Sequence, residues 1–295
     1  ADKSIIAFWR GKARRGKAEE MDAVKVYAVY FSPAGGTKQA AERVAAQLAA
    51  HMGVPWEAIN YTRPAARGEK RRFAPDDLVV FGTPTYAGRV PNKILPFLRE
   101  LFGGQNTPAV AVVTFGNRSF DSSLTELAEE LAQEGFCPFA AGAFAVRHVF
   151  SDKIGAGRPD ASDLDAMDAL AARAAEKLKA APPGTLRPAV IKGGAPVAPY
   201  YTPLGRDGAP VNFLKAKPET DPALCDGCGV CAAVCPLGSI DPENVFSVPG
   251  VCIKCQACVR RCPQHAKQFT DAAFLSHVAM LEENYTRRAE PELYL

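Results

Sequence analysis

The sequence of 295 residues lacks an apolar run of about 18 residues, the length at which a membrane-crossing helix is normally suspected. Its beginning also lacks the basic stretch, apolar core and small-residue cleavage site of a secretory signal. We therefore expect a cytoplasmic protein with no membrane span. Residues 1–22 contain a basic stretch, and the first methionine of the sequence, Met21, stands only near their end. We therefore interpret these residues as an N-terminal extension or a vector remnant.

Two nucleotide-binding motifs are missing as well. The chain has neither the G-x-x-x-x-G-K-S/T loop of nucleoside triphosphate sites nor the G-x-G-x-x-G turn of dinucleotide sites. A nicotinamide cofactor is therefore not expected.

The length and composition that are present are those of soluble globular protein, with 47% apolar and 23% charged residues. A chain of 295 residues exceeds what one compact domain usually needs, so we expect two domains. A Pro- and Gly-rich segment at 182–215 is interpreted as the linker between them. Because free linkers usually avoid aromatics, we expect Tyr200, Tyr201 and Phe213 to dock between the domains.

The first domain, at 23–181, alternates β-branched or apolar runs with amphipathic stretches. This pattern predicts an α/β fold with a doubly wound, five-stranded parallel sheet. Asp121 and Asp160 are expected to cap helices. The predicted strands are Val24–Phe31, Glu57–Tyr61, Leu78–Phe81, Ala109–Thr114 and Gly142–His148, and the predicted helices are Thr37–His51, Asn92–Leu101, Ser122–Gln133 and Ala161–Ala180.

Three loops follow the first, third and fourth of these strands, at the edge where doubly wound sheets bind ligands. They are Ser32–Thr37, Gly82–Pro91 and Thr114–Asp121. The first loop joins a strand to a helix N-terminus through glycines and hydroxyls. Free N–H groups and the helix dipole make such a turn an anion site, although an ordinary glycine-rich turn is the alternative.

Eight of the nine cysteines form a doubled C-x2-C-x2-C-x3-C-P pattern between Cys225 and Cys262. The x2 spacing lets three thiolates reach one 4Fe-4S cluster, while the fourth cysteine of each run reaches the other cluster. Two zinc sites are the alternative, but zinc modules usually lack a third x2-spaced thiolate. The predicted ligands are Cys225, Cys228, Cys231 and Cys262 for cluster 1, and Cys252, Cys255, Cys258 and Cys235 for cluster 2.

Such clusters change the charge balance. Each oxidised cluster with four thiolates carries about two net negative charges, so two of them outweigh the formal charge of +3 and leave nucleic-acid binding without support. Ile240 and Ile253 are expected to pack against the clusters. Lys254, Arg260 and Arg261 are interpreted as a solvated face, with attraction of an acidic partner as the alternative.

The region 216–271 resembles the bacterial two-cluster ferredoxins, which are small α+β domains, and the helical pattern at 272–295 is expected to pack on it as a C-terminal helix with a tail. The three loops resemble those of flavodoxins, which bind FMN. The order of the two parts resembles the flavodoxin-ferredoxin fusion proteins of anaerobes, the EFR-type ferredoxins. The resemblance implies a flavodoxin-like first domain, with FMN and two 4Fe-4S clusters as cofactors.

The same resemblance assigns the FMN contacts. The phosphate would be held by Ser32, Gly35, Gly36 and Thr37. Pro33 and Ala34 belong to the same cofactor-binding loop, and Ala34 stands where a hydroxyl residue is common, so one phosphate hydrogen bond is not expected there. Tyr86 is expected to stack on the ring. The alternative is that Tyr86 lies at the rim of the site and packs only on its own loop. The ring would be flanked by Pro84, Thr85, Tyr86, Ala87, Gly88, Thr114, Phe115, Gly116, Asn117, Arg118 and Phe120.

The function implied by the resemblance is single-electron transfer. A low-potential donor, such as a ferredoxin-reducing oxidoreductase or a hydrogenase, would reduce the clusters, and FMN would serve an acceptor protein. The competing hypothesis is an FMN-dependent reductase of a small organic acceptor. No acid/base pair near the loops indicates a substrate reaction, so no catalytic residue is assigned and the carrier is favoured.

Overall fold

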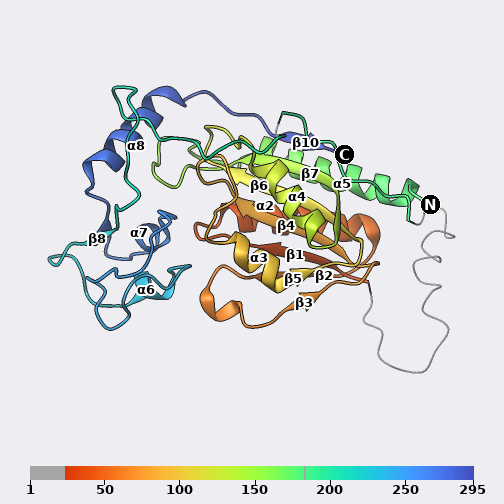
Figure 1. The fold of residues 1–295 in the computed structure, drawn as a ribbon, viewed down its shortest axis with the longest axis horizontal. Coiled ribbons are helices and arrows are strands. Elements are labelled where there is room, and N and C mark those ends of the chain that lie inside the picture. The colour runs from red at the N-terminus through yellow and green to blue at the C-terminus, as the bar shows by residue number, and fades with distance from the viewer. Residues whose placement is uncertain (1–23, 183, 194) are drawn as a thin grey trace.

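The structure is a computed structural model that describes residues 24–182, 184–193 and 195–295 (Figure 1). The expected N-terminal extension, 1–22, lies outside the described residues. Figure 1 shows a layered domain around a central sheet and, at one end of it, a small unit that contains β8, α6, α7 and β9. Helix α8 and the segment before β8 run between the two parts.

The central sheet has the strand order β10-β7-β6-β4-β1-β2. Strands β1 (Val26–Tyr30), β2 (Trp56–Asn60), β4 (Leu78–Pro84), β6 (Thr107–Phe115) and β7 (Phe136–Ala145) are parallel to their neighbours in this set. Numbered along the chain, these parallel strands follow the order 2-1-3-4-5, which is the flavodoxin order of doubly wound sheets. The predicted parallel sheet is therefore confirmed.

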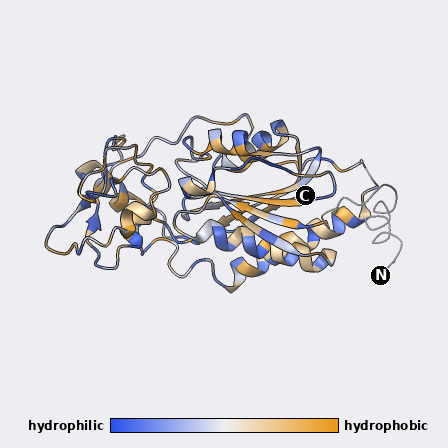
Figure 2. Cartoon of the chain, turned by 90° about the horizontal axis from the view of Figure 1, so that it is seen from below, coloured by the Kyte–Doolittle hydropathy of each residue, from blue (hydrophilic) through white to orange (hydrophobic). Residues whose placement is uncertain are grey.

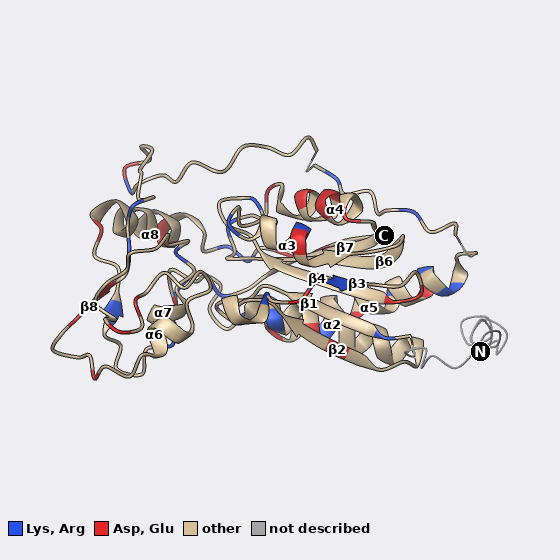
Figure 3. Ribbon diagram, turned by 60° about the horizontal axis from the view of Figure 1, so that its bottom comes forward, with Lys and Arg blue, Asp and Glu red and all other residues tan. Residues whose placement is uncertain are grey.

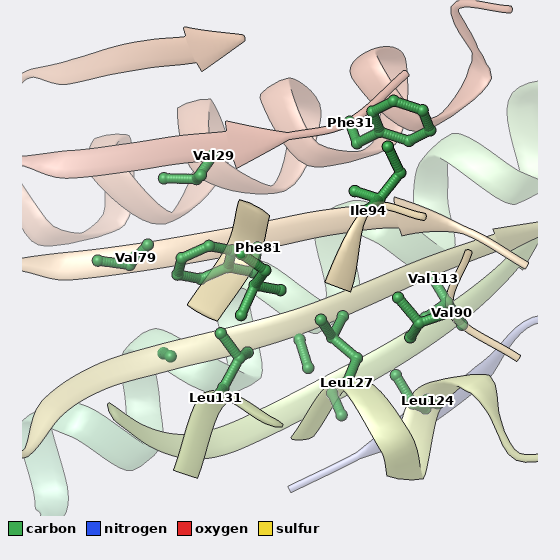
Figure 4. Packing of buried hydrophobic residues seen from close by; sticks show 14 of the residues in the cluster. Val29, Phe31, Val79, Phe81, Val90, Ile94, Val113, Leu124, Leu127 and Leu131 are labelled. Atoms are coloured by element: carbon green, nitrogen blue, oxygen red, sulfur yellow. The ribbon is translucent and has the colours of Figure 1, made fainter. Parts of the chain in front are cut away.

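Helices cover both faces of this sheet. Helices α2 (Gly36–Met52) and α5 (Ala161–Ala180) pack on one face, where small residues such as Ala41 and Ala174 allow close approach. Helices α3 (Leu95–Leu101) and α4 (Ser123–Gln133) pack on the other face. Figure 4 shows that second core, with Leu127 and Leu131 directed at the strands. Figure 2 shows the hydrophobic strands enclosed between helices of mixed colour, as burial on both faces requires.

Two predicted helix caps had different outcomes. Asp160 caps α5 through a capping box with Asp163, as predicted. The predicted cap at Asp121 is wrong, because α4 begins one residue later with Ser122 as its N-cap. Asp121 instead adopts a left-handed backbone with φ 43° and forms an ion pair with Arg118. The short elements β3 (Arg71–Arg72), β5 (Phe102–Gly103) and the 3-10 turn Pro64–Ala66 complete this domain.

A sixth strand joins the sheet at its edge. Strand β10 (Glu292–Tyr294) pairs antiparallel with β7, so the expectation of a five-stranded sheet is incomplete. The physical reason is that β7 would otherwise present unpaired backbone groups along an open edge. The C-terminal tail therefore returns from the small unit to the first domain and covers that edge (Figure 1).

The small unit contains little regular structure. It has the antiparallel pair β8 (Glu219–Thr220) and β9 (Lys267–Gln268), and the one-turn helices α6 (Val230–Ala233) and α7 (Ala257–Arg260). Its apolar centre includes Cys231, Cys258 and Ile240. With so little sheet or helix, the conformation of this unit depends on its cysteines and on its contacts with the rest of the chain.

Helix α8 (Ala272–Asn284) joins the two parts rather than packing on the small unit alone. Near its start, Phe274 packs against Phe269 of the small unit and Phe150 of the first domain, with ring centroids 4.7 and 4.9 Å apart. Near its end, Leu281 packs with Ile154 of the first domain. The expected contact with the second domain is present, and a contact with the first domain accompanies it.

Candidate functional site

A cavity of about 1350 Å³, here called the edge cavity, lies at the carboxyl ends of β1, β4 and β6. All three loops singled out from the sequence line it. The segments 200–203 and 210–214 and the stretch 251–254 of the small unit close it from the other side. The lining includes the predicted residues Ser32, Pro33, Ala34, Gly35, Gly36, Thr37, Pro84, Thr85, Tyr86, Ala87, Gly88, Thr114, Phe115, Gly116 and Arg118.

The first loop is shaped by hydroxyl groups. The Ser32 Oγ atom accepts a hydrogen bond from the backbone N–H of Lys38 at 2.8 Å, which fixes the turn against α2. The hydroxyls of Thr37 and Thr114 lie 2.7 Å apart and tie the first loop to the third. Gly35 has φ 98°, and a Cβ there would meet no atom within 4 Å. The first N–H groups of α2 have no carbonyl acceptor within the helix, so this end of the cavity suits an anion.

The second loop is a tight turn. Tyr86 and Arg89 exchange backbone hydrogen bonds of 2.8 and 3.1 Å. Between them, Gly88 has φ 79°, and a Cβ at this position would collide with the Asp121 carboxylate. Only glycine fits there, because the backbone is left-handed and the third loop lies against it. Tyr86 is half-buried at the cavity wall.

Two predicted ring contacts have other partners. Asn117 donates its amide to the backbone oxygens of Tyr285 and Arg287, at 2.9 and 2.7 Å, and so anchors the C-terminal tail. Phe120 packs on Phe115 with ring centroids 5.5 Å apart. Neither Asn117 nor Phe120 lines the edge cavity. The sequence pattern does not separate the residues of this loop that face the cavity from those that face away from it.

The segment between the domains forms part of the wall of the edge cavity, in addition to the three loops. Tyr201 donates its backbone N–H to the Ala87 oxygen at 2.8 Å, and its ring lies under the Arg118 guanidinium at 4.0 Å. The Tyr200 hydroxyl donates to the Val90 oxygen at 3.2 Å. Phe213 packs against Phe274 of α8 with ring centroids 5.5 Å apart. These contacts agree with the expectation that the aromatics dock between the parts.

His148 also lines the edge cavity, after the fifth parallel strand. Burial, followed by the charges of His277, Arg260 and Arg118, lowers the pKa of His148 to about 4, so its ring is neutral at pH 7. Its Nδ1 atom accepts a hydrogen bond from the Phe150 N–H at 3.1 Å. A neutral ring fixed in this way is a wall of the cavity rather than a source of charge.

A second, smaller cavity lies within the small unit and is here called the cysteine cavity. Its lining includes Cys252, Cys255 and Cys258 of the second run, together with Cys235 of the first run. These are the four residues predicted to hold cluster 2. Ile240 and Ile253, which were expected to pack on the clusters, line it as well.

The other predicted ligand set spans both runs in the same manner. Burial raises the pKa of the Cys231 thiol, and the nearby Cys262 of the other run raises it further. Gln264 donates to the Asp226 carboxylate at 3.0 Å and so links the ends of the two runs. Cys228 is exposed, whereas Cys225 and Cys262 are half-buried.

Two thiols of the cysteine cavity have pKa values above the ordinary range. Burial, together with the neighbouring Cys252 and Cys235, raises the pKa of Cys258 to about 12, and burial also raises that of Cys255. Metal binding must therefore release their protons. Among the described residues, no three His, Cys, Asp or Glu side chains are grouped so as to hold a single metal ion.

The two cavities share one wall. Val251, Cys252 and Ile253 line both the edge cavity and the cysteine cavity. Tyr86 approaches this wall from the opposite side: burial, and then the nearby Cys255 and Cys252, raise the pKa of its hydroxyl. A single turn of chain therefore separates the two sites.

Two basic residues of the second run belong to the interface between the parts. Lys254 is buried and donates to the backbone oxygens of Leu214 and Cys252. Arg260 donates to the oxygens of Val149 and His148, each at 2.9 Å. The interpretation of these two as a solvated face is wrong, because their side chains bind carbonyl groups at the junction. Only Arg261 of the three is exposed.

Comparison with known proteins agrees with the small unit. A family model described as a 4Fe-4S dicluster domain matches residues 217–263. No curated protein matches the chain.

Several solved structures resemble the first domain. An archaeal flavodoxin is 19% identical over 53% of this chain and 99% of its own, with a TM-score of 0.38. The flavodoxin of Streptococcus pneumoniae TIGR4 is 16% identical over 52% and 99%, with a TM-score of 0.37. Rubredoxin oxygen:oxidoreductase from Desulfovibrio gigas is 21% identical over 53% of this chain and 37% of its own, with a TM-score of 0.35. These scores are low, so the flavodoxin-like assignment depends on the strand order.

The strand order and the dicluster match together are consistent with a flavodoxin-ferredoxin fusion. The two folds support iron–sulfur and flavin cofactors, and hence a redox protein. Within the described part of the chain, no helix has the length and apolar character needed to traverse a membrane.

Proposed function

We propose that this protein transfers single electrons between a low-potential donor, two 4Fe-4S clusters, an FMN and an acceptor protein. The observation that carries the proposal is the shared wall: Val251, Cys252 and Ile253 line both the cysteine cavity and the edge cavity. A cluster and a flavin in these sites would be separated by one turn of chain. Such a separation suits direct electron exchange without a moving carrier.

The residues of the edge cavity fit FMN. Its phosphate would lie at the start of α2, where Gly35 leaves open space and the helix N–H groups are free of helical acceptors. Its ring would lie between the second and third loops, beside Tyr86. FMN, when bound, supplies a group that exchanges electrons singly or in pairs. The loops, Tyr201 and the stretch 251–254 would cover part of its surface and reduce its contact with water.

The domain division follows from the same assignment. The flavodoxin-like domain would cover 23–181, the linker 182–215, the two-cluster unit 216–271, and the C-terminal helix and tail 272–295. Cluster 2, held by Cys235, Cys252, Cys255 and Cys258, would be the cluster beside FMN, because Cys252 lines both cavities. Cluster 1 would lie on the outer side.

The outer cluster is the proposed site at which the donor delivers electrons. Its predicted ligand Cys228 is exposed, and Leu224, which directly precedes the predicted ligand Cys225, is 51% exposed. The small unit carries the exposed acidic residues Glu219, Asp226 and Glu243, and Figure 3 shows charges of both signs on both parts of the molecule. A donor such as a ferredoxin-reducing oxidoreductase or a hydrogenase would therefore present a basic rim around an apolar centre.

One observation favours the second candidate, an FMN-dependent reductase of a small organic acceptor. The edge cavity, at about 1350 Å³, exceeds the range of about 300–1,000 Å³ of common ligand sites. Such a volume leaves room for a second small molecule beside the flavin. Against this candidate, the neutral His148 and the paired Arg118 provide no free charge for a substrate.

The test is anaerobic reconstitution with iron, sulfide and FMN, followed by quantification of each and a reductive titration read by absorbance. The proposal expects about eight irons and one releasable FMN per chain, and reduction of the flavin through the clusters. Zinc in place of iron, or a chain that retains no flavin or retains FAD, would refute it. Saturable turnover of one organic acceptor would show that the protein acts as the reductase and not as an electron carrier.

A further inference from the structure

Gln256 is a buried polar residue whose side-chain nitrogen has no partner. It stands between Cys255 and Cys258, and only 5% of its surface is exposed. Its Nε2 atom is fully buried and makes no hydrogen bond to any described residue. Because an unpaired buried donor is costly, such a group usually indicates a partner that the protein chain does not itself supply.

The surroundings of Gln256 indicate what that partner is. Gln256 lines the cysteine cavity together with Cys235, Cys252, Cys255 and Cys258. Its backbone is left-handed, with φ 61°, and its carbonyl oxygen accepts a hydrogen bond from the Arg260 N–H at 2.9 Å. The backbone acceptor is thus used to start α7, while the side-chain donor remains unpaired in a residue that lines the same cavity as four cysteines.

We propose that Gln256 Nε2 donates a hydrogen bond to a sulfur of cluster 2 and raises the reduction potential of that cluster. The inference rests on the proposed function, because it requires the cluster to be present. An N–H donor stabilises the extra negative charge of the reduced cluster more than that of the oxidised one. Cluster 2 is therefore easier to reduce than it would be with an apolar residue at position 256.

The position of this cluster gives the hydrogen bond a functional role. Cys252 belongs both to the ligand set and to the wall of the edge cavity. Compared with a chain that lacks this donor, an electron that arrives at the outer cluster then has a greater tendency to move to the inner cluster, on the flavin side. Gln256 thereby acts as a tuning residue that biases the distribution of electrons between the two clusters.

The experiment compares Gln256→Leu and Gln256→Met with the unchanged chain in a redox titration followed by electron paramagnetic resonance. Both variants keep the volume but lose the donor, so one of the two cluster potentials should fall. A tenfold loss in the reduction equilibrium corresponds to about 59 mV for one electron. Two variants are used because a branched side chain at this position has the greater risk of disturbing the fold.

Gln264→Leu is the matched control. Its Nε2 atom already bonds to Asp226, and it does not line the cysteine cavity. It should leave the potential of cluster 2 unchanged. If both Gln256 variants hold two clusters at unaltered potentials, the inference is wrong. If the unchanged chain holds no clusters at all, the proposed function fails first, and iron and sulfide counts distinguish that outcome.

Discussion

At the scale of single residues, the start of α2 depends on hydroxyl groups with different tasks. Ser32 uses its oxygen within the loop, as the acceptor for Lys38 N–H. Thr37 is buried, and its hydroxyl meets that of Thr114 across two loops. Since a hydroxyl has one donor and two acceptor positions, Thr37 can serve Thr114 and still donate to a phosphate. The two roles are separable by substitution.

Replacing Thr37 by Val should weaken FMN binding by about tenfold or more, because a hydrogen bond to a charged group contributes about 1.5–3 kcal/mol. The clusters, which lie in the small unit, should retain their full absorbance. The measurement is the dissociation constant of FMN by fluorescence quenching, with cluster absorbance recorded in parallel.

Thr114→Val is the control for this prediction. It removes the same contact between the two hydroxyls but leaves Thr37 free to bind phosphate. Its effect on FMN binding should therefore be smaller than that of Thr37→Val. Equal losses in the two variants would contradict a contribution of Thr37 to phosphate binding beyond its contact with Thr114.

At the scale of elements, local pattern predicts what is buried on both faces. Strand β6 is buried at every position, and its run of Val and Ala residues indicates a strand without any tertiary information. Helix α5 has the predicted bounds because Asp160 marks its start. Strand β10 carries no such signal, since its three residues form a strand only because β7 offers an edge.

The same limit applies to the site. The loops of the edge cavity follow from their place at strand ends, and the cysteine sets follow from spacing. The orientation of the Asn117 side chain cannot be predicted from local sequence, because its hydrogen-bond partners lie 168 and 170 residues further along the chain. The roles of Lys254 and Arg260 cannot be predicted in this way either. In the sequence they look like exposed surface residues, and only the structure shows the carbonyl groups that accept their hydrogen bonds.

Removing residues 291–295 should expose the β7 edge and lower the free energy of unfolding by about 1–3 kcal/mol, through lost pairing and burial of Leu293 and Leu295. Urea unfolding measures the loss, and size-exclusion chromatography should show new self-association. Glu292→Ala keeps the strand and removes an exposed side chain together with its exposed hydrogen bond from the Tyr294 hydroxyl, so it should alter stability by less than about 0.5 kcal/mol. A truncated chain that is as stable as the intact one, and monomeric, would contradict a structural role for β10.

At the scale of the whole molecule, several contacts hold the small unit against the flavodoxin-like domain. Arg260 binds the 148–152 loop, and α8 packs on both parts. On another side, Arg67 donates to the Pro236 oxygen at 2.8 Å, directly after Cys235. The C-terminal strand β10 also connects the parts, because it returns to the central sheet and pairs with β7. These contacts come from separate segments of the chain, so loss of one should loosen the junction locally without separating the two parts.

Replacing Arg260 by Met should therefore open the junction locally. The Arg260 guanidinium bonds to two carbonyl oxygens and to Asp152, and its side chain is only 18% exposed. Loss of these bonds should cost about 2 kcal/mol, or roughly 30-fold in the local opening equilibrium. Hydrogen exchange should rise at 148–152, and electron exchange between the inner cluster and the flavin should slow after rapid partial reduction.

Arg261→Met is the neighbouring control, because Arg261 is exposed and the substitution changes the charge of the small unit by the same amount. If charge alone mattered, for instance through attraction of a partner, the two variants would behave alike and hydrogen exchange at 148–152 would not change in either. If the junction mattered, only Arg260→Met would raise that exchange and slow the internal step. The second outcome is expected, since Arg260 supplies the contacts that press the shared wall of Val251, Cys252 and Ile253 toward the flavin loops.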